Sequence, residues 1–199
     1  MGKRICVYCC SSNRIALRYV EAAAQFARLV ALQGHTIVCG GTSKGLMGVL
    51  TGATIEAGGS IEGIVPEFMF QYGWDDKRLT HLTVAENMRE RKFLMMKDAD
   101  AVVAFPGAMG TLEELSEAIS LKRLGQFCNP IIIFNQDGFY DSLLRFFDNM
   151  VQECMMGADQ SQVWKVVSRV EDILPAMDAT PIWTPDIVNY HDSNECGNQ

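Results

Sequence analysis

The stretch Ala101-Val-Val-Ala-Phe-Pro-Gly-Ala-Met-Gly-Thr-Leu-Glu-Glu-Leu115 decides the fold. It begins as an apolar run of strand length, passes through a glycine turn, and continues with the leucine and glutamate spacing of a helix. A strand without polar alternation is typical of a parallel sheet that is buried on both faces. The stretch therefore predicts one strand-turn-helix unit of an α/β protein, with its turn at the carboxyl end of the strand.

The same alternation of strand and helix runs through the rest of the chain. We expect strands at residues 4–9, 36–39, 60–65, 101–105 and 130–134, with a weaker one near 79–84, and helices at about 16–33, 46–57, 87–99, 110–124 and 140–154. This order predicts a Rossmann-like, doubly wound α/β fold, with a mostly parallel sheet and helices on both faces. We expect a single nucleotide-binding domain over residues 1–178 and an extended or partly disordered tail over 179–199.

Composition limits the class of partner. The 199 residues are 48% hydrophobic and 21% charged, and no apolar run has the length needed to span a bilayer. A net charge of -7 and a pI near 4.9 argue against nucleic acid as a partner, because binding it requires a basic surface. The start of the chain lacks the apolar segment of a secretion signal, so we expect a cytoplasmic protein with neither membrane nor nucleic acid as partner.

The cysteines and histidines do not form a metal or redox motif. Seven scattered cysteines suit a reducing compartment better than a disulfide framework. Cys6 and Cys9 have the CxxC spacing, but they lie in a predicted strand, where residues three apart face opposite sides. The three histidines are isolated from the cysteines, so we expect no metal site.

Three predicted turns follow strands and contain small residues: 9–12, 39–48 and 105–111. Ligands of doubly wound sheets bind at such turns, beyond the carboxyl ends of the strands. None of the turns is a Walker A motif, and none has the GxGxxG spacing of a dinucleotide site. What remains is glycine turns whose free backbone N–H groups and positive helix ends could hold a phosphate, although glycines there could also serve only to make tight turns.

A carboxylate lies in an unexpected place on the helix predicted after residue 110. On a helical wheel Glu114 falls inside the apolar half, whereas Glu113 and Glu117 fall on the solvated half. A favourable interaction with the positive end of the helix, worth about 0.3–1 kcal/mol, would account for the position of Glu114. A catalytic role is the alternative, and helix physics alone leaves both open.

Three cationic side chains lie in the first turns of the preceding predicted helix. Asn87 and Glu90 have the spacing of a capping box and predict a helix start at Asn87. The first turns then carry Arg89, Arg91 and Lys92 at the positive end of the helix dipole, which would be unfavourable unless an anion binds there. Solvated charges partly offset by Glu86 and Glu90 are the alternative. Arg91 falls among apolar side chains on the wheel, which predicts its partial burial.

Taken together, residues 3–177 resemble the Lonely Guy family of cytokinin riboside 5'-monophosphate phosphoribohydrolases, once labelled lysine decarboxylases. The resemblance rests on Cys6-Val-Tyr-Cys-Cys-Ser-Ser12, Gly40-Gly-Thr-Ser-Lys-Gly-Leu-Met-Gly48, Met88-Arg-Glu-Arg-Lys92 and Pro106-Gly-Ala-Met-Gly-Thr-Leu-Glu-Glu114. It implies a Rossmann-like homodimer or higher oligomer that hydrolyses the N-glycosidic bond of a purine nucleoside 5'-monophosphate, without a cofactor. It also implies that Arg91 and Glu114 are the catalytic pair.

The resemblance further implies that the substrate's phosphate binds near the 106–111 turn. The expected substrate-binding residues are Ser11, Gly41, Thr42, Gly45, Met88, Arg89, Lys92, Gly107, Ala108, Met109, Gly110, Thr111 and Glu113.

This chain departs from the family pattern at four positions, where Cys10, Thr42 and Ala108 replace glycines and Arg89 replaces a histidine. If the turn required a positive φ at Ala108, the cost would be about 1 kcal/mol. A glutamate that the family uses has no counterpart in residues 71–76.

Two other functions are weighed against this one. A non-catalytic nucleotide or molybdenum-cofactor carrier would share the fold and the glycine turn. A lysine decarboxylase would require pyridoxal phosphate on a lysine, and the sequence gives no Schiff-base setting to Lys44, Lys92, Lys97 or Lys122. The apolar stretch formed by Phe68, Met69, Phe70, Tyr72 and Trp74 favours oligomerisation, with burial in the core as the alternative.

Overall fold

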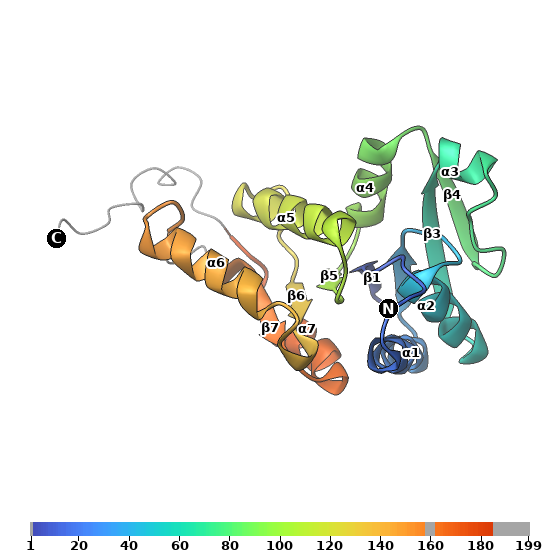
Figure 1. The fold of residues 1–199 in the computed structure, drawn as a ribbon, viewed down its shortest axis with the longest axis horizontal. Helices are drawn as coiled ribbons and strands as arrows, with labels where there is room; N and C mark the ends of the chain where they lie inside the picture. The colour runs from blue at the N-terminus through green and yellow to red at the C-terminus, as the bar shows by residue number, and fades with distance from the viewer. Residues whose placement is uncertain (1, 158–161, 185–199) are drawn as a thin grey trace.

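The computed structural model describes residues 2–157 and 162–184 of the chain, which form a seven-stranded sheet with helices on both faces (Figure 1). Every strand pairs in parallel with its neighbours, in the order β4-β3-β2-β1-β5-β6-β7. The strands are β1 (Arg4–Tyr8), β2 (Thr36–Cys39), β3 (Ser60–Pro66), β4 (His81–Ala85), β5 (Ala101–Ala104), β6 (Ile131–Phe134) and β7 (Lys165–Val167). The predicted doubly wound α/β fold is confirmed.

The helices divide between the two faces of the sheet. One face is covered by α1 (Leu17–Leu32), α2 (Gly45–Glu56) and α7 (Ile173–Ala179), and the other by α4 (Met88–Met96), α5 (Met109–Arg123) and α6 (Asp141–Gln152). Figure 1 shows α4 and α5 on the opposite side of the strands from α1.

The sheet has one hydrophobic core on each face, and the residues from Ile5 to Cys9 belong alternately to the two cores. Ile5, Val7 and Cys9 lie in the core beneath α1, whereas Cys6 and Tyr8 lie in the core beneath α5. Cys6 and Cys9 therefore face opposite sides of the sheet, as their spacing in a strand predicts.

Within the described residues, five short elements were not expected from the sequence: α3 (Glu67–Gln71), β7, α7 and the 3-10 helices η1 (Gln136–Gly138) and η3 (Val170–Asp172). Strand β7 is an edge strand of three residues whose position is set by pairing with β6, and so short a segment carries little periodicity of its own. The helix expected over 87–99 ends at Met96, and Asp98 has a left-handed φ of 57° that turns the chain toward β5. These differences move element boundaries without changing the fold.

The end of the described chain packs against the domain. Helix α7 ends at Ala179, and the backbone N–H of Trp183 donates to the carbonyl of Cys128 at 2.8 Å. The side chain of Trp183 packs against the core beneath α5. Most of the predicted tail, residues 185–199, lies outside the described residues.

The connections of the sheet create a crevice next to β1. From β1 the chain adds β2, β3 and β4 on one side, and it then crosses back to place β5 on the other side of β1. The loops that leave β1 and β5 consequently diverge in opposite directions, and such a switch point is where ligands bind in open α/β sheets. Both loops belong to the turns that the sequence singled out.

Candidate active site

A cavity of about 350 Å³ lies at this switch point. Its walls come from the turns after β1, β2 and β5, from α4 and from the start of α5. Of the residues predicted from the sequence, it is lined by Ser11, Thr42, Met88, Arg91, Ala108, Gly110, Thr111, Glu113 and Glu114. The structure thus brings together residues as far apart in the chain as Ser11 and Glu114.

The predicted pair Arg91 and Glu114 is in direct contact. Nη1 of Arg91 donates to Oε1 of Glu114 at 3.0 Å, and their side chains are only 8% and 11% exposed. Nε of Arg91 donates to the backbone carbonyl of Ile64 at 2.9 Å, which fixes the guanidinium over the end of β3. Among the described residues no protein group donates to Oε2 of Glu114, so this oxygen can accept a bond from a ligand or water.

Burial governs the protonation of Glu114. The pKa of this carboxyl is raised above its usual range because burial disfavours the charged form, and the neighbouring Arg91 partly opposes that effect. A carboxyl of raised pKa in a cavity is typical of a group that exchanges protons during a reaction.

Gly40 makes room for the guanidinium. A β-carbon built at this position would overlap Nη2 of Arg91 and crowd the sulfur of Met47. Gly40 lies directly after β2 and lines the cavity. Because its φ is not in the left-handed region, space rather than backbone conformation requires glycine here.

The start of α5 offers backbone donors to the cavity. Ala108 is the N-cap residue and makes no side-chain capping bond, and the first intrahelical N–H to find an acceptor is that of Leu112, which donates to the Ala108 carbonyl. The N–H groups of Gly110 and Thr111 precede it at the positive end of the helix. Ala108 has an extended φ of -95°, so alanine causes no left-handed strain in this turn.

The start of α2 is different, because protein groups already occupy it. The N–H of Gly45 donates to Oδ1 of Asn13 at 2.7 Å, and the N–H of Leu46 donates to the carbonyl of Cys10 at 2.8 Å. Gly45 has a φ of 57°, and it packs so closely on Ser11 that a β-carbon would overlap the backbone there. Among the described residues, protein groups thus occupy two of the first three N–H groups of α2, whereas the N–H groups of Gly110 and Thr111 in α5 remain free for a ligand.

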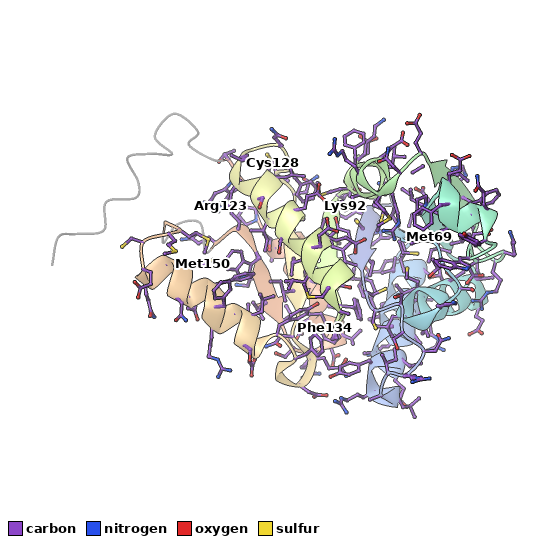
Figure 2. All side chains as sticks on the ribbon, turned by 45° about the horizontal axis from the view of Figure 1, so that its top comes forward. Met69, Lys92, Arg123, Cys128, Phe134 and Met150 are labelled. Atoms are coloured by element: carbon purple, nitrogen blue, oxygen red, sulfur yellow. The ribbon has the colours of Figure 1, made fainter. Side chains whose placement is uncertain are left out.

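The cations of α4 find their partners inside the protein. Lys92 pairs with Glu113 and, at 2.9 Å, with Glu117, so it connects α4 to α5 (Figure 2). Arg91 is paired with Glu114, as described above. Neither an external anion nor solvation is needed to balance Arg91 and Lys92, because carboxylates of α5 neutralise these two of the three cations.

The predicted start of α4 is confirmed. Oδ1 of Asn87 accepts bonds from the N–H groups of Arg89 and Glu90, each at 3.0 Å. The carboxylate of Glu90 accepts from the N–H of Glu86, at 2.6 Å, rather than from Asn87.

Six of the predicted binding residues do not line the cavity. Arg89 and Lys92 border a separate hollow between α4 and α5, and Gly107 borders an apolar hollow beside Tyr19 and Phe139. Gly41, with a φ of 73°, packs on Val65 and Gly63 and shapes the turn after β2. Gly45 and the exposed Met109 are the remaining two.

The structure also adds residues that the sequence did not single out as ligand contacts. They are Gly40, Lys44, Met47, Met69, Trp74 and Met95. Met69 and Trp74 come from the α3 side of the molecule, where Figure 2 labels Met69. Backbone contacts between the 72–76 loop and the turn after β2, among them a bridge between Thr42 and Asp75, hold this loop beside the cavity. A contact of that kind has no local signal in the sequence.

The described part of the chain contains neither a metal-ligand cluster nor a membrane-spanning helix. No cluster of three or more histidine, cysteine, aspartate or glutamate side chains is placed to hold a metal ion. No helix there has the length and apolar character that crossing a membrane requires.

The fold and the site define a Rossmann-like α/β protein whose switch-point cavity contains a buried carboxylate–guanidinium pair beside a free helix start. A family model described as "Possible lysine decarboxylase" matches residues 47–177. The chain is 32% identical over 188 residues to the cytokinin riboside 5'-monophosphate phosphoribohydrolase LOG of Oryza sativa, covering 91% of this chain and 78% of that protein. It is 38% identical over 151 residues to LOG2 of Arabidopsis thaliana, covering 76% and 71%. The chain belongs to this family, that of the LOG phosphoribohydrolases.

Solved structures of other proteins share the fold. The molybdenum cofactor carrier protein of Chlamydomonas reinhardtii superposes with a TM-score of 0.68 at 18% identity, over 90% of this chain and 98% of that one. The molybdenum cofactor binding protein of Rippkaea orientalis gives 0.69 at 21% identity, over 90% and 97%. At these identities the likeness extends to the fold alone.

Proposed function

We propose that the protein hydrolyses the N-glycosidic bond of a purine nucleoside 5'-monophosphate and releases the free base and ribose 5-phosphate. The observation that carries this proposal is the buried contact between Arg91 and Glu114 in the wall of the cavity. The names of the curated relatives, all phosphoribohydrolases of cytokinin riboside 5'-monophosphates, support the same reaction.

The cavity has a polar end that suits a phosphate. The free N–H groups at the start of α5 can donate to phosphate oxygens, and the helix dipole favours an anion there. The hydroxyl of Thr111 belongs to the same end, since this residue lines the cavity. A nucleotide held at this end by its 5'-phosphate directs its ribose toward Glu114, which lies about one helical turn further on.

Glu114 is placed to act on the ribose. Cleavage of an N-glycosidic bond proceeds through an oxocarbenium-like sugar, which a nearby carboxylate stabilises. The free Oε2 can also activate water, bind a ribose hydroxyl or attack C1', and the proposal leaves these roles open. At roughly 6 Å, a phosphate would repel the carboxylate by about 3 kcal/mol per unit charge at an effective dielectric near 20. The paired Arg91 offsets that repulsion.

The remaining wall suits a flat apolar base. It consists of thioethers and one indole, contributed by Met47, Met69, Trp74, Met88 and Met95. Methionine and tryptophan side chains pack well against aromatic rings. No asparagine or glutamine lines the cavity within the described residues, so we propose that packing rather than hydrogen bonds along one edge of the base selects it.

The assignment as an enzyme is tested by incubating the protein with a panel of nucleoside monophosphates and measuring free base by chromatography. Release of base with stoichiometric ribose 5-phosphate supports the proposal. Tight binding without release would support the alternative, a non-catalytic nucleotide or cofactor carrier.

The residues do not fit a decarboxylase that uses pyridoxal phosphate. Lys44 is the one lysine that lines the cavity among the described residues, and it is exposed. Lys92 is held by carboxylates. Lys122 is buried and donates to the carbonyl of Asn129 at 2.8 Å, away from the cavity.

We further propose a cytoplasmic homodimer or higher oligomer that acts without cofactor or metal. The free thiols of Cys6, Cys9, Cys10, Cys39 and Cys128 support this compartment. The aromatic residues of the 68–74 segment are exposed rather than buried in the core, since Phe68, Phe70, Tyr72 and Trp74 are 40–72% exposed. Apolar surface of this kind is typical of contacts between subunits. Residues 1–178 are proposed to act as one domain.

A further inference from the structure

Lys44 is a cation of the cavity that has no carboxylate partner. Arg91 and Lys44 are the two cationic side chains that line the cavity in the described part of the chain. Arg91 already bonds to Glu114 through Nη1 and to Ile64 through Nε, whereas no carboxylate of the described residues lies within ion-pair distance of Lys44. Its Nζ instead lies 5.3 Å from the centroid of the Trp74 ring.

The contact between Lys44 and Trp74 is held in place by the fold. The N–H of Ser43 donates to the carbonyl of Trp74 at 3.4 Å, and Thr42 forms a bridge with Asp75. The Trp74 ring also stacks on Tyr72, with centroids 5.6 Å apart. The indole face therefore gives the ammonium group a weak partner at a fixed position on the wall of the cavity.

Among the described residues that line the cavity, Lys44 is the cation that has no carboxylate partner and can therefore pair with a phosphate. Arg91 and Lys44 balance Glu113 and Glu114, and Arg91 is already paired. The start of α5 contributes only about half a positive charge. Lys92 is held by Glu113 and Glu117, and Arg89 borders a different hollow. A phosphate monoester carries up to two negative charges, and a flexible lysine can follow it.

We propose that Lys44 binds the 5'-phosphate of the nucleotide and makes the site selective for nucleotides over nucleosides. In the free protein its ammonium group rests on the face of Trp74, and it leaves that face when a phosphate enters. This inference rests on the proposed function, because it takes the cavity to be a nucleotide site. It adds to that function the residue that recognises the phosphate.

The experiment compares Lys44→Gln with Lys77→Gln in equilibrium binding of AMP and adenosine, measured by calorimetry; every protein, the wild-type reference included, also carries Glu114→Gln so that AMP is not hydrolysed. Lys77 is a matched control, because its Nζ lies 5.5 Å from the centroid of the Phe70 ring and both substitutions remove one positive charge. Lys77 pairs with Asp75 at 2.7 Å and does not line the cavity. Lys44→Gln should weaken AMP binding about tenfold, since hydrogen bonds between charged groups are the strong ones, and should leave adenosine binding unchanged. Lys77→Gln should change neither.

Two further measurements make the test specific. The difference between wild type and Lys44→Gln should shrink as the salt concentration rises, because Lys44 is exposed and its charge is screened. AMP should change the tryptophan fluorescence of the wild type more than that of Lys44→Gln, because only in the wild type does an ammonium group leave the face of Trp74.

The outcomes separate the two proposals. If the wild type binds AMP more tightly than adenosine but Lys44→Gln binds AMP as tightly as Lys77→Gln does, the role of Lys44 is overturned and the nucleotide site stands. If the wild type binds AMP no more tightly than adenosine, the phosphate site at the start of α5 is overturned together with the role of Lys44. Thermal melting of each variant confirms that it is folded.

Discussion

Nη1 of Arg91 lies 3.0 Å from Oε1 of Glu114, although the two residues belong to different helices and are 23 positions apart in the chain. Both side chains are buried, so each charge has lost most of its contact with water. The pair therefore costs desolvation energy, and the attraction between the partners returns part of it. A buried pair that adds little stability is expected where the buried carboxylate itself is needed for function.

Replacing Glu114 with glutamine should abolish turnover while nucleotide binding persists. The amide keeps the size of the side chain but can neither accept a proton nor stabilise a positive sugar, and loss of a catalytic carboxylate lowers rates by about 10²–10⁴-fold. The measurement is kcat for base release beside the Kd for AMP. Glu117→Gln is the control on the same helix, because Glu117 pairs with Lys92 outside the cavity. Undiminished turnover in Glu114→Gln would refute the catalytic role.

Replacing Arg91 with methionine should destabilise the protein through Glu114. Removal of one partner of a buried pair leaves an uncompensated charge, and we expect a loss of about 3 kcal/mol at pH 7 in urea unfolding. The double variant Arg91→Met with Glu114→Gln removes that charge and should recover part of the loss. A double variant that is as unstable as the sum of the two single changes would show that the residues do not interact.

The raised pKa of Glu114 fixes the sign of two pH effects. If turnover requires the ionised carboxylate, kcat should fall as the pH drops through a pKa above the ordinary value of 4.5. When folding raises the pKa of a carboxyl, that group adds to the free energy of unfolding at a pH below its unfolded pKa. This contribution is lost as the pH rises through the folded pKa. The stability of wild type relative to Glu114→Gln should therefore decrease over that range. A difference that is constant from pH 4 to pH 8 would contradict the burial of this charge.

Much of the fold was predictable because its signals are local. Apolar runs such as 101–104 give strands of a parallel sheet, and the Asn87 cap marks the start of α4. The helical wheel also predicted the burial of Glu114, since the apolar half of α5 faces the sheet. These features depend on residues within one or two turns of each other.

The rest of the site depends on contacts between distant segments. The sequence shows three cations at the start of α4, but not that Lys92 pairs with α5. It shows two similar glycine turns, but not that Asn13 and Cys10 occupy the donors of one of them. Trp74 reaches the cavity through backbone contacts of its loop with the turn after β2, such as the bridge between Thr42 and Asp75. No local pattern encodes such pairings, so the tertiary structure was needed to choose among the candidates.

Replacing Gly40 with alanine should disturb the site through Arg91. The new β-carbon would overlap Nη2, so the guanidinium must move from Ile64 or Glu114, and overpacking of this kind costs about 1–3 kcal/mol. Glu114 would lose part of its partner, and its pKa should rise further, which NMR of the labelled carboxyl can measure. Gly52→Ala is the control: a β-carbon in this turn of α2 would meet only the flexible end of Arg78, so stability should hold or improve. An unchanged Glu114 pKa in folded Gly40→Ala would mean that Gly40 does not position Arg91.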